Sequence, residues 1–224
     1  MPAIWENILN FIYPLSCDIC GKTLAAVNQR RLCDTCWERI STVNSPYCPR
    51  PDIENKIYFR RVQAVGRYEG ILKECIHLVK YSRKRALNKA LSELMISHIN
   101  DHLNIEAFDC LVPVPLYRRQ YWKRGFNQTE LLVEKLGCHF NKTIIIGNLK
   151  RIKHTRPQYR LNKPQRIKNM KEAFSSIVPA VFEDKTILLV DDVYTTGATV
   201  NECAKVLSRA GARAVDVLVL AHGS

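Results

Sequence analysis

The sequence lacks any long apolar stretch, since no run among its 224 residues approaches the ~18 that cross a bilayer. Its N-terminus carries Glu6 and has neither a basic segment nor a long apolar core, so no secretory signal is expected. Low complexity is excluded by a composition of 46% hydrophobic and 25% charged residues, which can bury a core. We therefore expect a soluble, cytoplasmic protein that does not span a membrane, with one ordinary domain and at most a small appendage.

Acidic residues are scarce in one segment of the chain. Residues 111–171 hold 15 basic side chains and only two acidic ones, Glu130 and Glu134. The rest of the chain is balanced, so this segment carries the whole net charge of +13. Such a concentration of positive charge attracts polyanions and phosphorylated ligands. The alternative is a solvated basic face that serves solubility.

Four of the nine cysteines form two Cys-x2-Cys pairs separated by 12 residues. Four thiolates with this spacing can converge on a tetrahedral Zn²⁺ ion. The alternatives are disulfides, which the cytoplasm disfavours, and a redox pair, which would need one reactive pair beside a βαβ unit. The pattern therefore predicts one structural zinc ion per chain. Its ligands would be Cys17, Cys20, Cys33 and Cys36.

The other cysteines show no such pairing. Cys48 has no cysteine three residues on, because Pro51 stands there. The remaining four lie in apolar or helical contexts, and small core residues are the expected role for such cysteines. They are Cys75, Cys110, Cys138 and Cys203.

Short apolar strands alternate with helical patterns along the chain, which predicts an α/β fold with a mainly parallel sheet flanked by helices. Residues 148–171 are polar and basic with little periodicity, so a long loop is expected there. We divide the chain into a small zinc-binding domain with an N-terminal helix at 1–60 and the α/β domain at 61–224. Strands are expected at 62–68, 108–116, 143–147, 186–190 and 214–220, and helices at 4–12, 71–81, 86–103, 127–138 and 199–210.

The most informative stretch is 187–200, ILLVDDVYTTGATV, in which an apolar strand runs into two acids, a loop and a helix. Ligands of open α/β sheets bind beyond the carboxyl ends of the strands, where Asp191 and Asp192 lie. Adjacent acids on an extended chain point to different sides, which suits the paired hydroxyls of a ribose better than a single metal ion. The loop offers Gly197, threonine hydroxyls and N–H groups at a helix start, a combination that cradles phosphate. Together these pieces specify a sugar with a diol and a 5′-phosphate.

Other nucleotide-binding motifs are missing. The sequence contains neither the Gly-x4-Gly-Lys of a Walker A loop nor a Rossmann fingerprint. The remaining alternative is an ordinary strand–turn–helix whose threonines cap the helix. Two adjacent acids at a strand end argue against it, because unpaired acids there cost stability.

The run 187–200 resembles the phosphoribosyl-pyrophosphate (PRPP) binding motif of type I phosphoribosyltransferases. Over nearly its whole length, the chain resembles the ComF family. The resemblance lies in the cysteine knuckle followed by Trp37, in the stretch PVPLYRRQYWKRGFNQTELL at 113–132, and in matches beyond it. Members of that family usually carry a second cysteine pair near Cys48, and Pro51 replaces its partner here.

The resemblance implies a type I phosphoribosyltransferase-like fold and a set of contacts with PRPP. Asp191 and Asp192, the catalytic candidates, would take the ribose 2′- and 3′-hydroxyls. Mg²⁺ would bridge pyrophosphate and ribose oxygens, since it prefers substrate phosphates to an all-protein site. The remaining PRPP-binding residues would be Val193, Tyr194, Thr195, Thr196, Gly197, Ala198 and Thr199 in the phosphate loop, and Pro113, Val114, Pro115 and Leu116 in the pyrophosphate loop.

The segment 117–126 is both basic and aromatic. Cations that follow phosphates and rings that stack on bases fit single-stranded nucleic acid. The ComF resemblance implies handling of incoming single-stranded DNA during natural competence. Trp122 and Phe126 could instead be core or loop anchors. The cations that would neutralise pyrophosphate or contact DNA are Arg118, Arg119, Lys123 and Arg124.

Three functions remain open at this point. The first is a PRPP-binding competence protein that binds single-stranded DNA in the cytoplasm. The second is an active phosphoribosyltransferase, for which the sequence specifies no acceptor. The third is a structural adaptor whose zinc knuckle docks a competence helicase or an inner-membrane channel protein.

Overall fold

The structure is a computed structural model. It describes residues 15–25, 30–43, 56–82, 84–153, 165 and 170–223. The helix expected at 4–12 and the unpaired Cys48 lie outside this part of the chain. No helix among the described residues is long and apolar enough to cross a membrane.

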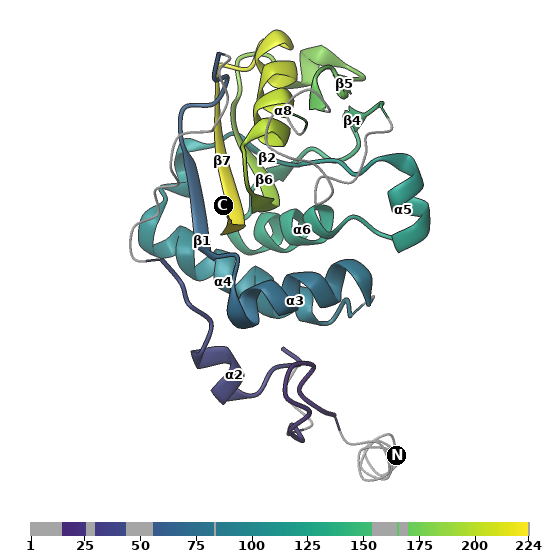
Figure 1. Cartoon of the computed structure of the whole chain (residues 1–224). Coiled ribbons are helices and arrows are strands. Elements are labelled where there is room, and N and C mark those ends of the chain that lie inside the picture. Colours follow the sequence, from purple (N-terminus) through teal and green to yellow (C-terminus); the bar gives the residue numbers. More distant parts are fainter. Residues whose placement is uncertain are drawn as a thin grey trace, which may run out of the picture.

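Five parallel strands form the central sheet in the order β1-β7-β6-β2-β3 (Figure 1). Nearly every residue of β2, β6 and β7 is buried, as in sheets that carry helices on both faces. The expected α/β fold with a parallel sheet flanked by helices is thereby confirmed. The strands are β1 (Val62–Arg67), β2 (Cys110–Pro113), β3 (Thr143–Ile144), β6 (Thr186–Tyr194) and β7 (Ala214–His222).

Helices cover both faces of the sheet. Leu188 of β6 packs into the core beneath α3, α4 and α6, and Leu189 packs into the core beneath α8. Because strand residues alternate between faces, Asp191 continues the α8 face and Asp192 continues the α3 face. The helices are α3 (Gly70–Tyr81), α4 (Leu87–His102), α6 (Gln128–Phe140) and α8 (Ala198–Arg209), with 3-10 turns η1 (Ile105–Ala107) and η3 (Pro179–Phe182).

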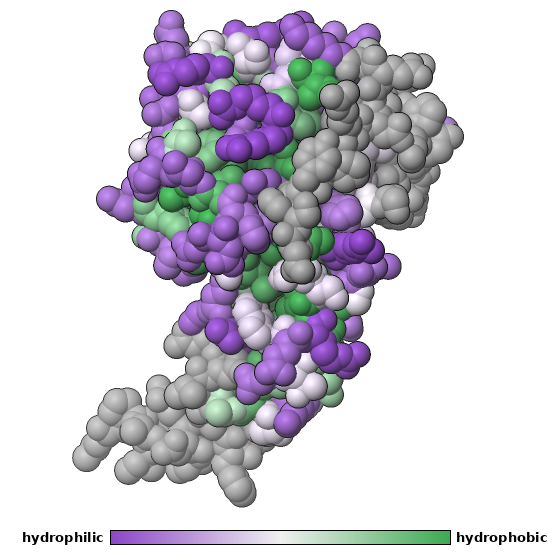
Figure 2. All heavy atoms as spheres, turned by 90° about the vertical axis from the view of Figure 1, so that its left-hand side faces the viewer, coloured by the Kyte–Doolittle hydropathy of each residue, from purple (hydrophilic) through white to green (hydrophobic). Residues whose placement is uncertain are grey.

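The N-terminal knuckle, described at residues 15–25 and 30–43, packs against α3 and α4. Its buried Leu24, Leu32 and Ile40 belong to the same core as Leu72 and Ile76 of α3. Hydrophobic residues are visible where the knuckle meets the body of the molecule (Figure 2). The knuckle is therefore held by apolar burial as well as by its own metal site.

The chain leaves the knuckle along the outer edge of the sheet. Thr42 forms a β-bridge with Gly66 of β1, and the N–H of Val43 donates to the carbonyl of Val65 at 3.0 Å. A Cβ atom at position 66 would lie 2.6 Å from the carbonyl oxygen of Ser41. Only glycine allows this approach, so Gly66 fixes the path from the knuckle into the sheet.

The sequence-based expectations are wrong in several details. The strand expected at 108–116 ends at Pro113, and the one expected at 186–190 continues to Tyr194 because β7 pairs with it up to His222. The loop expected at 148–171 begins with a strand, since β4 (Leu149–Arg151) pairs with β5 (Phe174–Ser176). Three residues are too few to show a hydrophobic period, which is why the sequence gives no sign of β4.

A helix also forms where none was expected. α5 (Arg118–Arg124) follows the pyrophosphate loop and buries none of its residues. It ends at Gly125, whose φ of 79° is the left-handed conformation that closes helices. Without a buried face, α5 has no apolar stripe for the sequence to reveal.

Candidate functional site

The four paired cysteines come together in space. Their Sγ atoms all lie within 4.8 Å of one another, and all four are free thiols. Zn–S bonds of about 2.3 Å in a tetrahedron place sulfurs roughly 3.8 Å apart, and the Sγ atoms of Cys20 and Cys33 are 3.6 Å apart. A disulfide would need about 2.05 Å. Four soft sulfur ligands at this spacing fit Zn²⁺, so residues Cys17, Cys20, Cys33 and Cys36 form a zinc-binding cluster.

A tight turn positions the first pair of thiols, and a helix start positions the second. After Cys17, the chain folds back so that the N–H of Gly21 donates to its carbonyl at 3.0 Å, with Gly21 at a φ of 75°. Cys33 directly precedes α2 (Asp34–Glu38), and its carbonyl accepts the N–H of Trp37 at 2.9 Å. The second pair is therefore fixed at a helix start.

The thiols of this cluster differ in their pKa values. Burial opposes ionisation of Cys17, but backbone N–H groups of Cys20 and Cys33 outweigh it and lower the pKa of Cys17 to about 7. Burial raises the pKa of Cys36 well above its usual value, and the neighbouring thiols add to this effect. A coordinated Zn²⁺ removes this difference between the thiols, because it deprotonates the thiols that bind it.

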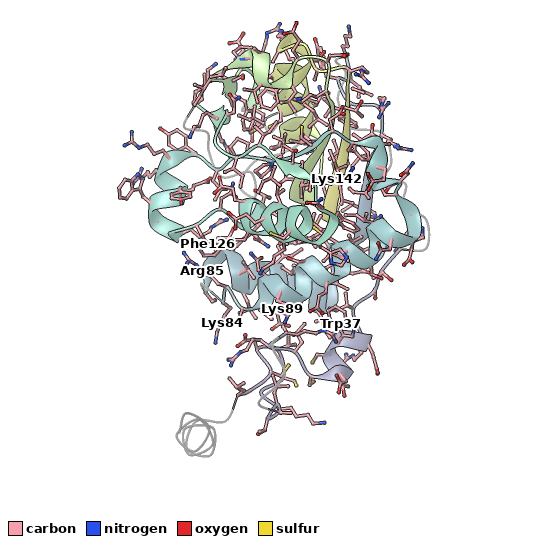
Figure 3. The ribbon with its side chains drawn as sticks, turned by 180° about the vertical axis from the view of Figure 1, so that it is seen from behind. Trp37, Lys84, Arg85, Lys89, Phe126 and Lys142 are labelled. Atoms are coloured by element: carbon pink, nitrogen blue, oxygen red, sulfur yellow. The ribbon has the colours of Figure 1, made fainter. Side chains whose placement is uncertain are left out.

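Ion pairs tie the knuckle to the helices. The buried carboxylate of Asp18 accepts from Arg31 Nη2 at 3.4 Å and from Lys84 Nζ at 3.1 Å. Arg30 pairs with Glu93 of α4. Lys84 lies where the knuckle meets the helices (Figure 3). The knuckle thus contacts α4 and the segment that joins α3 to α4.

The other described cysteines differ in burial. Cys75, Cys110 and Cys203 are buried, and burial raises the pKa of Cys75 to about 12 and of Cys110 to about 11. These three are inert core residues, as expected. The same expectation is wrong for Cys138, which is exposed because it lies on the solvent side of α6.

The acid pair sits at the carboxyl edge of the sheet. Asp191 is only 9% exposed, and its Oδ1 accepts the backbone N–H of Asp192 at 2.8 Å. Burial raises the pKa of Asp191 to about 7, and the charge of Asp192 adds to the rise. Lys80 and Arg151 act in the opposite direction. Asp191 is therefore a carboxyl group that can change its protonation state near neutral pH.

Lys80 is a site residue that the sequence analysis missed. Its Nζ lies 2.7 Å from Oδ1 of Asp192, and both side chains are mostly buried. Lys80 stands in the last turn of α3, four residues after Ile76 and eight after Leu72, both of which are fully buried. Helical residues at this spacing share one face. A lysine within an apolar stripe was the signal that could have revealed it.

Arg151 is a second missed residue. It lies half-buried on β4, with its guanidinium 5.8 Å above the ring of Phe174 and Nη2 3.7 Å from Sδ of Met170. Burial lowers the pKa of Arg151, and the nearby Asp191 counteracts this. A β-bridge joins Arg151 to Tyr117, at the end of the pyrophosphate loop. The basic stretch treated as a loop thus supplies a cation to the site.

The loop at 195–199, the expected phosphate loop, leads into the start of α8 with Gly197 as the N-cap residue. Gly197 adopts a φ of 78° directly before α8, and Thr196 Oγ1 accepts the N–H of Ala198 at 3.4 Å. Thr196 is buried, whereas Thr195 and Thr199 are half-buried. The N-terminus of this 12-residue helix offers N–H groups and a positive dipole to an anion.

The last two residues of β6 pack against the hydrophobic cores. Val193 packs with the core on the α3 side, and Tyr194 is buried in the core on the α8 side. The carbonyl of Tyr194 accepts the N–H of Gly223 at 2.9 Å. Their side chains therefore fix the loop, and what they can offer a ligand is backbone.

The segment 113–116, the expected pyrophosphate loop, begins at the last residue of β2, the strand next to β6. The N–H of Val114 donates to the carbonyl of Val190 at 2.9 Å. The carbonyl of Val114 accepts from Asn127 Nδ2 at 3.1 Å and from Thr129 Oγ1 at 2.7 Å, so the start of α6 pins the loop. Because β2 and β6 are parallel neighbours, both loops emerge at one edge of the sheet. Pro113, Val114 and Pro115 are buried and Leu116 is half-buried.

The basic helix α5 presents most of its cations to solvent. Arg118, Arg119 and Lys123 are exposed, and Arg124 is half-buried with its guanidinium 5.8 Å above the ring of Tyr81. Around this helix lies an open hollow of about 500 Å³. It is lined by Tyr117, Arg118, Arg119 and Trp122.

The two aromatic candidates near α5 differ. Phe126 is buried beneath Arg85, whose guanidinium lies 4.3 Å above the ring and donates to the carbonyl of Gly125 at 3.0 Å (Figure 3). Phe126 is thus an anchor. Trp122 is 73% exposed and belongs to neither hydrophobic core of the described residues, so within that part of the chain its ring faces solvent.

These features define a class: a zinc-knuckle protein with a parallel α/β domain whose carboxyl edge carries an acid pair, a glycine-capped helix and a basic helix. Residues 8–51 match the double zinc ribbon domain family. The DNA utilization protein YhgH of Escherichia coli K12 is 32% identical over 211 residues, which cover 91% of this chain and 88% of that protein.

Two further relatives carry competence names. Competence protein F of Haemophilus influenzae is 30% identical, over 85% of this chain and 90% of its own length. Competence protein ComFC of Streptococcus pneumoniae is 27% identical, over 92% and 99%. The chain belongs to the ComF family.

Solved structures are also similar. The glutamine PRPP amidotransferase of Bacillus subtilis, complexed with ADP and GMP, is 16% identical with a TM-score of 0.41. The match covers 59% of this chain and 26% of the amidotransferase. The assignment of the fold to the parallel α/β class rests on the strand order itself.

Proposed function

We propose that this protein binds PRPP together with Mg²⁺ at the edge where the loops after β2 and β6 emerge. The observation that carries the proposal is an acid pair followed within five residues by a glycine-capped helix start. A carboxylate pair accepts hydrogen bonds from vicinal hydroxyls, and a helix N-terminus binds phosphate. A 5-phosphoribosyl group carries both vicinal hydroxyls and a phosphate.

Each part of the ligand has a partner at this edge. Asp191 and Asp192 would accept the ribose hydroxyls, and the loop at 195–199 would hold the 5′-phosphate. The pyrophosphate would lie by the loop after β2, where Arg118 and Arg119 begin the basic helix. Mg²⁺ would supply charge compensation between phosphate oxygens.

Calorimetric titration with Mg²⁺ and PRPP tests this site. The unaltered protein is expected to bind, and Asp191→Ala/Asp192→Ala is expected to give no heat, because it removes both hydrogen-bond acceptors. The exposed pair Asp101→Ala/Asp184→Ala is the matched control and should bind normally. Absence of heat and of any thermal shift in the unaltered protein would rule out the proposal.

We further propose that the surface formed by α5 and Tyr81 binds single-stranded DNA. Exposed cations on α5 can follow a phosphate backbone, and the exposed rings of Trp122 and Tyr81 can stack on bases. Arg124 joins the two elements through its contact with Tyr81. Together with the competence and DNA-utilization names of its relatives, this surface supports a role in DNA uptake in the cytoplasm.

The salt dependence of DNA binding distinguishes a dedicated surface from a general attraction of DNA to a basic protein. Replacing Arg118, Arg119 and Lys123 by glutamine should weaken DNA binding and lower the slope of log K against log salt by about 2, since each single-strand phosphate contact contributes about 0.7. The matched control replaces three exposed cations elsewhere and keeps the same net charge. It consists of Lys73→Gln, Lys135→Gln and Arg209→Gln. Equal losses in both triple variants would contradict a dedicated surface.

A further inference from the structure

We propose that Lys80 is a positioning residue of the ligand site: it holds the Asp192 carboxylate in place and compensates its charge so that an anionic ligand can approach. The inference rests on the proposed PRPP site and extends it to a residue from a different element. Lys80 lies on α3 and is 112 residues away from Asp192 in sequence.

The geometry of the pair is well defined. Nζ of Lys80 is 2.7 Å from Oδ1 of Asp192, and the two side chains are only 16% and 14% exposed. Leu72, Ile76 and Val79 are fully buried and fix α3 against the sheet, with the knuckle behind it. Lys80 therefore meets Asp192 from a rigid element rather than from a loop.

The charges around the acid pair come from several elements. Asp191 is faced by Lys80 from α3, Arg151 from β4 and the thiol of Cys203 from α8, besides Asp192 itself. Tyr68, which directly follows β1, lies in the field of both Lys80 and Asp192. Burial raises the pKa of that tyrosine, so it is neutral at physiological pH. Lys80 and Arg151 are thus the cations that offset two carboxylates.

This balance matters for a polyanionic ligand. Two carboxylates at a water-poor edge would repel the phosphates of PRPP, and repulsion is strong where screening by water is weak. Lys80 compensates one of these charges through Oδ1 of Asp192, and no side chain among the described residues forms an ion pair with Oδ2. A methionine at position 80 would continue the apolar stripe of α3 and avoid the cost of a buried ion pair. A lysine there indicates that the site uses its charge.

A double-mutant cycle tests the role. Calorimetric titration with Mg²⁺ and PRPP should show at least tenfold weaker binding for Lys80→Met, with a normal affinity for Lys73→Met, a lysine on the exposed face of the same helix. In the Asp192→Asn background, Lys80→Met should have no further effect, because the partner is gone. Lys80→Arg should recover part of the affinity. Wild-type affinity in Lys80→Met, or additive losses in the double variant, would overturn the inference.

A second readout needs no ligand. Carboxyl ¹³C titration of the free protein should show a higher pKa for Asp191 in Lys80→Met than in the unaltered protein, since Lys80 opposes its rise, and no change in Lys73→Met. An unchanged Asp191 titration in Lys80→Met would refute the inference even if PRPP binds. If the unaltered protein binds no PRPP, the proposed function fails, and the carboxyl titration still decides whether Lys80 controls the acid pair.

Discussion

Asp191→Asn is expected to stabilise the ligand-free protein at pH 8 while removing its affinity for PRPP. A free aspartate ionises near pH 4, and burial raises the pKa of Asp191 in the folded protein to about 7. Between these values the folded state binds more protons than the unfolded state, so stability falls as the pH rises. Asparagine does not titrate, and its Oδ1 can still accept the N–H of Asp192.

Chemical denaturation at several pH values measures this effect. At pH 8 the variant should gain on the order of 4 kcal/mol in free energy of unfolding, because a shift of about three pKa units corresponds to about 1.4 kcal/mol per unit, and at pH 4 the gain should nearly vanish. Asp101→Asn changes an exposed carboxyl group and should show no such pH-dependent gain. A variant that is destabilised equally at both pH values would show that Asp191 is an ordinary structural acid. A residue that lowers the stability of the folded protein but is needed for binding is typical of functional sites.

Removal of zinc is expected to loosen the knuckle and the helices beneath it. Leu24, Leu32 and Ile40 are buried against α3 and α4. Each such side chain contributes about 1.5–3 kcal/mol by burial, so the loss is on the order of 5 kcal/mol. For a protein of this size, that lowers the melting temperature by roughly 10–20 °C. Metal analysis and thermal unfolding after treatment with a strong chelator measure both quantities.

A matched pair of cysteine variants completes the zinc experiment. Cys36→Ser should reduce the zinc content from about one ion per chain to near zero and lower the melting temperature as chelation does. Cys138→Ser changes an exposed thiol outside the cluster and should do neither. Metal-free protein with an unchanged melting temperature would contradict the structural role of the zinc.

The sequence predicted the parts of the site that lie close together along the chain. The strand, acid pair and glycine-capped helix from Thr186 to Arg209 form one continuous segment, and its chemistry can be read locally. The cysteine pairs are equally local, because their spacing alone constrains the metal geometry. The α/β class also followed from the alternation of elements.

The parts that the sequence did not reveal come from distant segments. Lys80 meets Asp192 only because α3 packs beside β6, and Arg151 meets the site only because β4 and β5 pair across the basic stretch. A lysine within the apolar stripe of α3 marks Lys80 as unusual, but nothing local in the sequence names its partner or reveals Arg151. Trp122 was ambiguous for a related reason, since exposure depends on whether another element covers it. Tertiary packing decides all three cases.

The two proposed ligands would share the carboxyl end of α3. Lys80 pairs with Asp192, and the next residue, Tyr81, contacts Arg124 of the proposed DNA-binding surface. Two sites joined by one rigid helix can influence each other, and any such coupling must be reciprocal. Measuring DNA affinity with and without Mg²⁺ and PRPP would quantify it.

The most direct test of the PRPP site is to follow backbone amide resonances while Mg²⁺ and PRPP are added. The account predicts the largest shifts at Val193–Thr199 and at the loop after Pro113, with the amides of the zinc knuckle nearly unmoved. Asp191→Ala/Asp192→Ala should abolish these shifts. Unperturbed amides at the start of α8, or shifts centred away from the edge shared by β2 and β6, would contradict it.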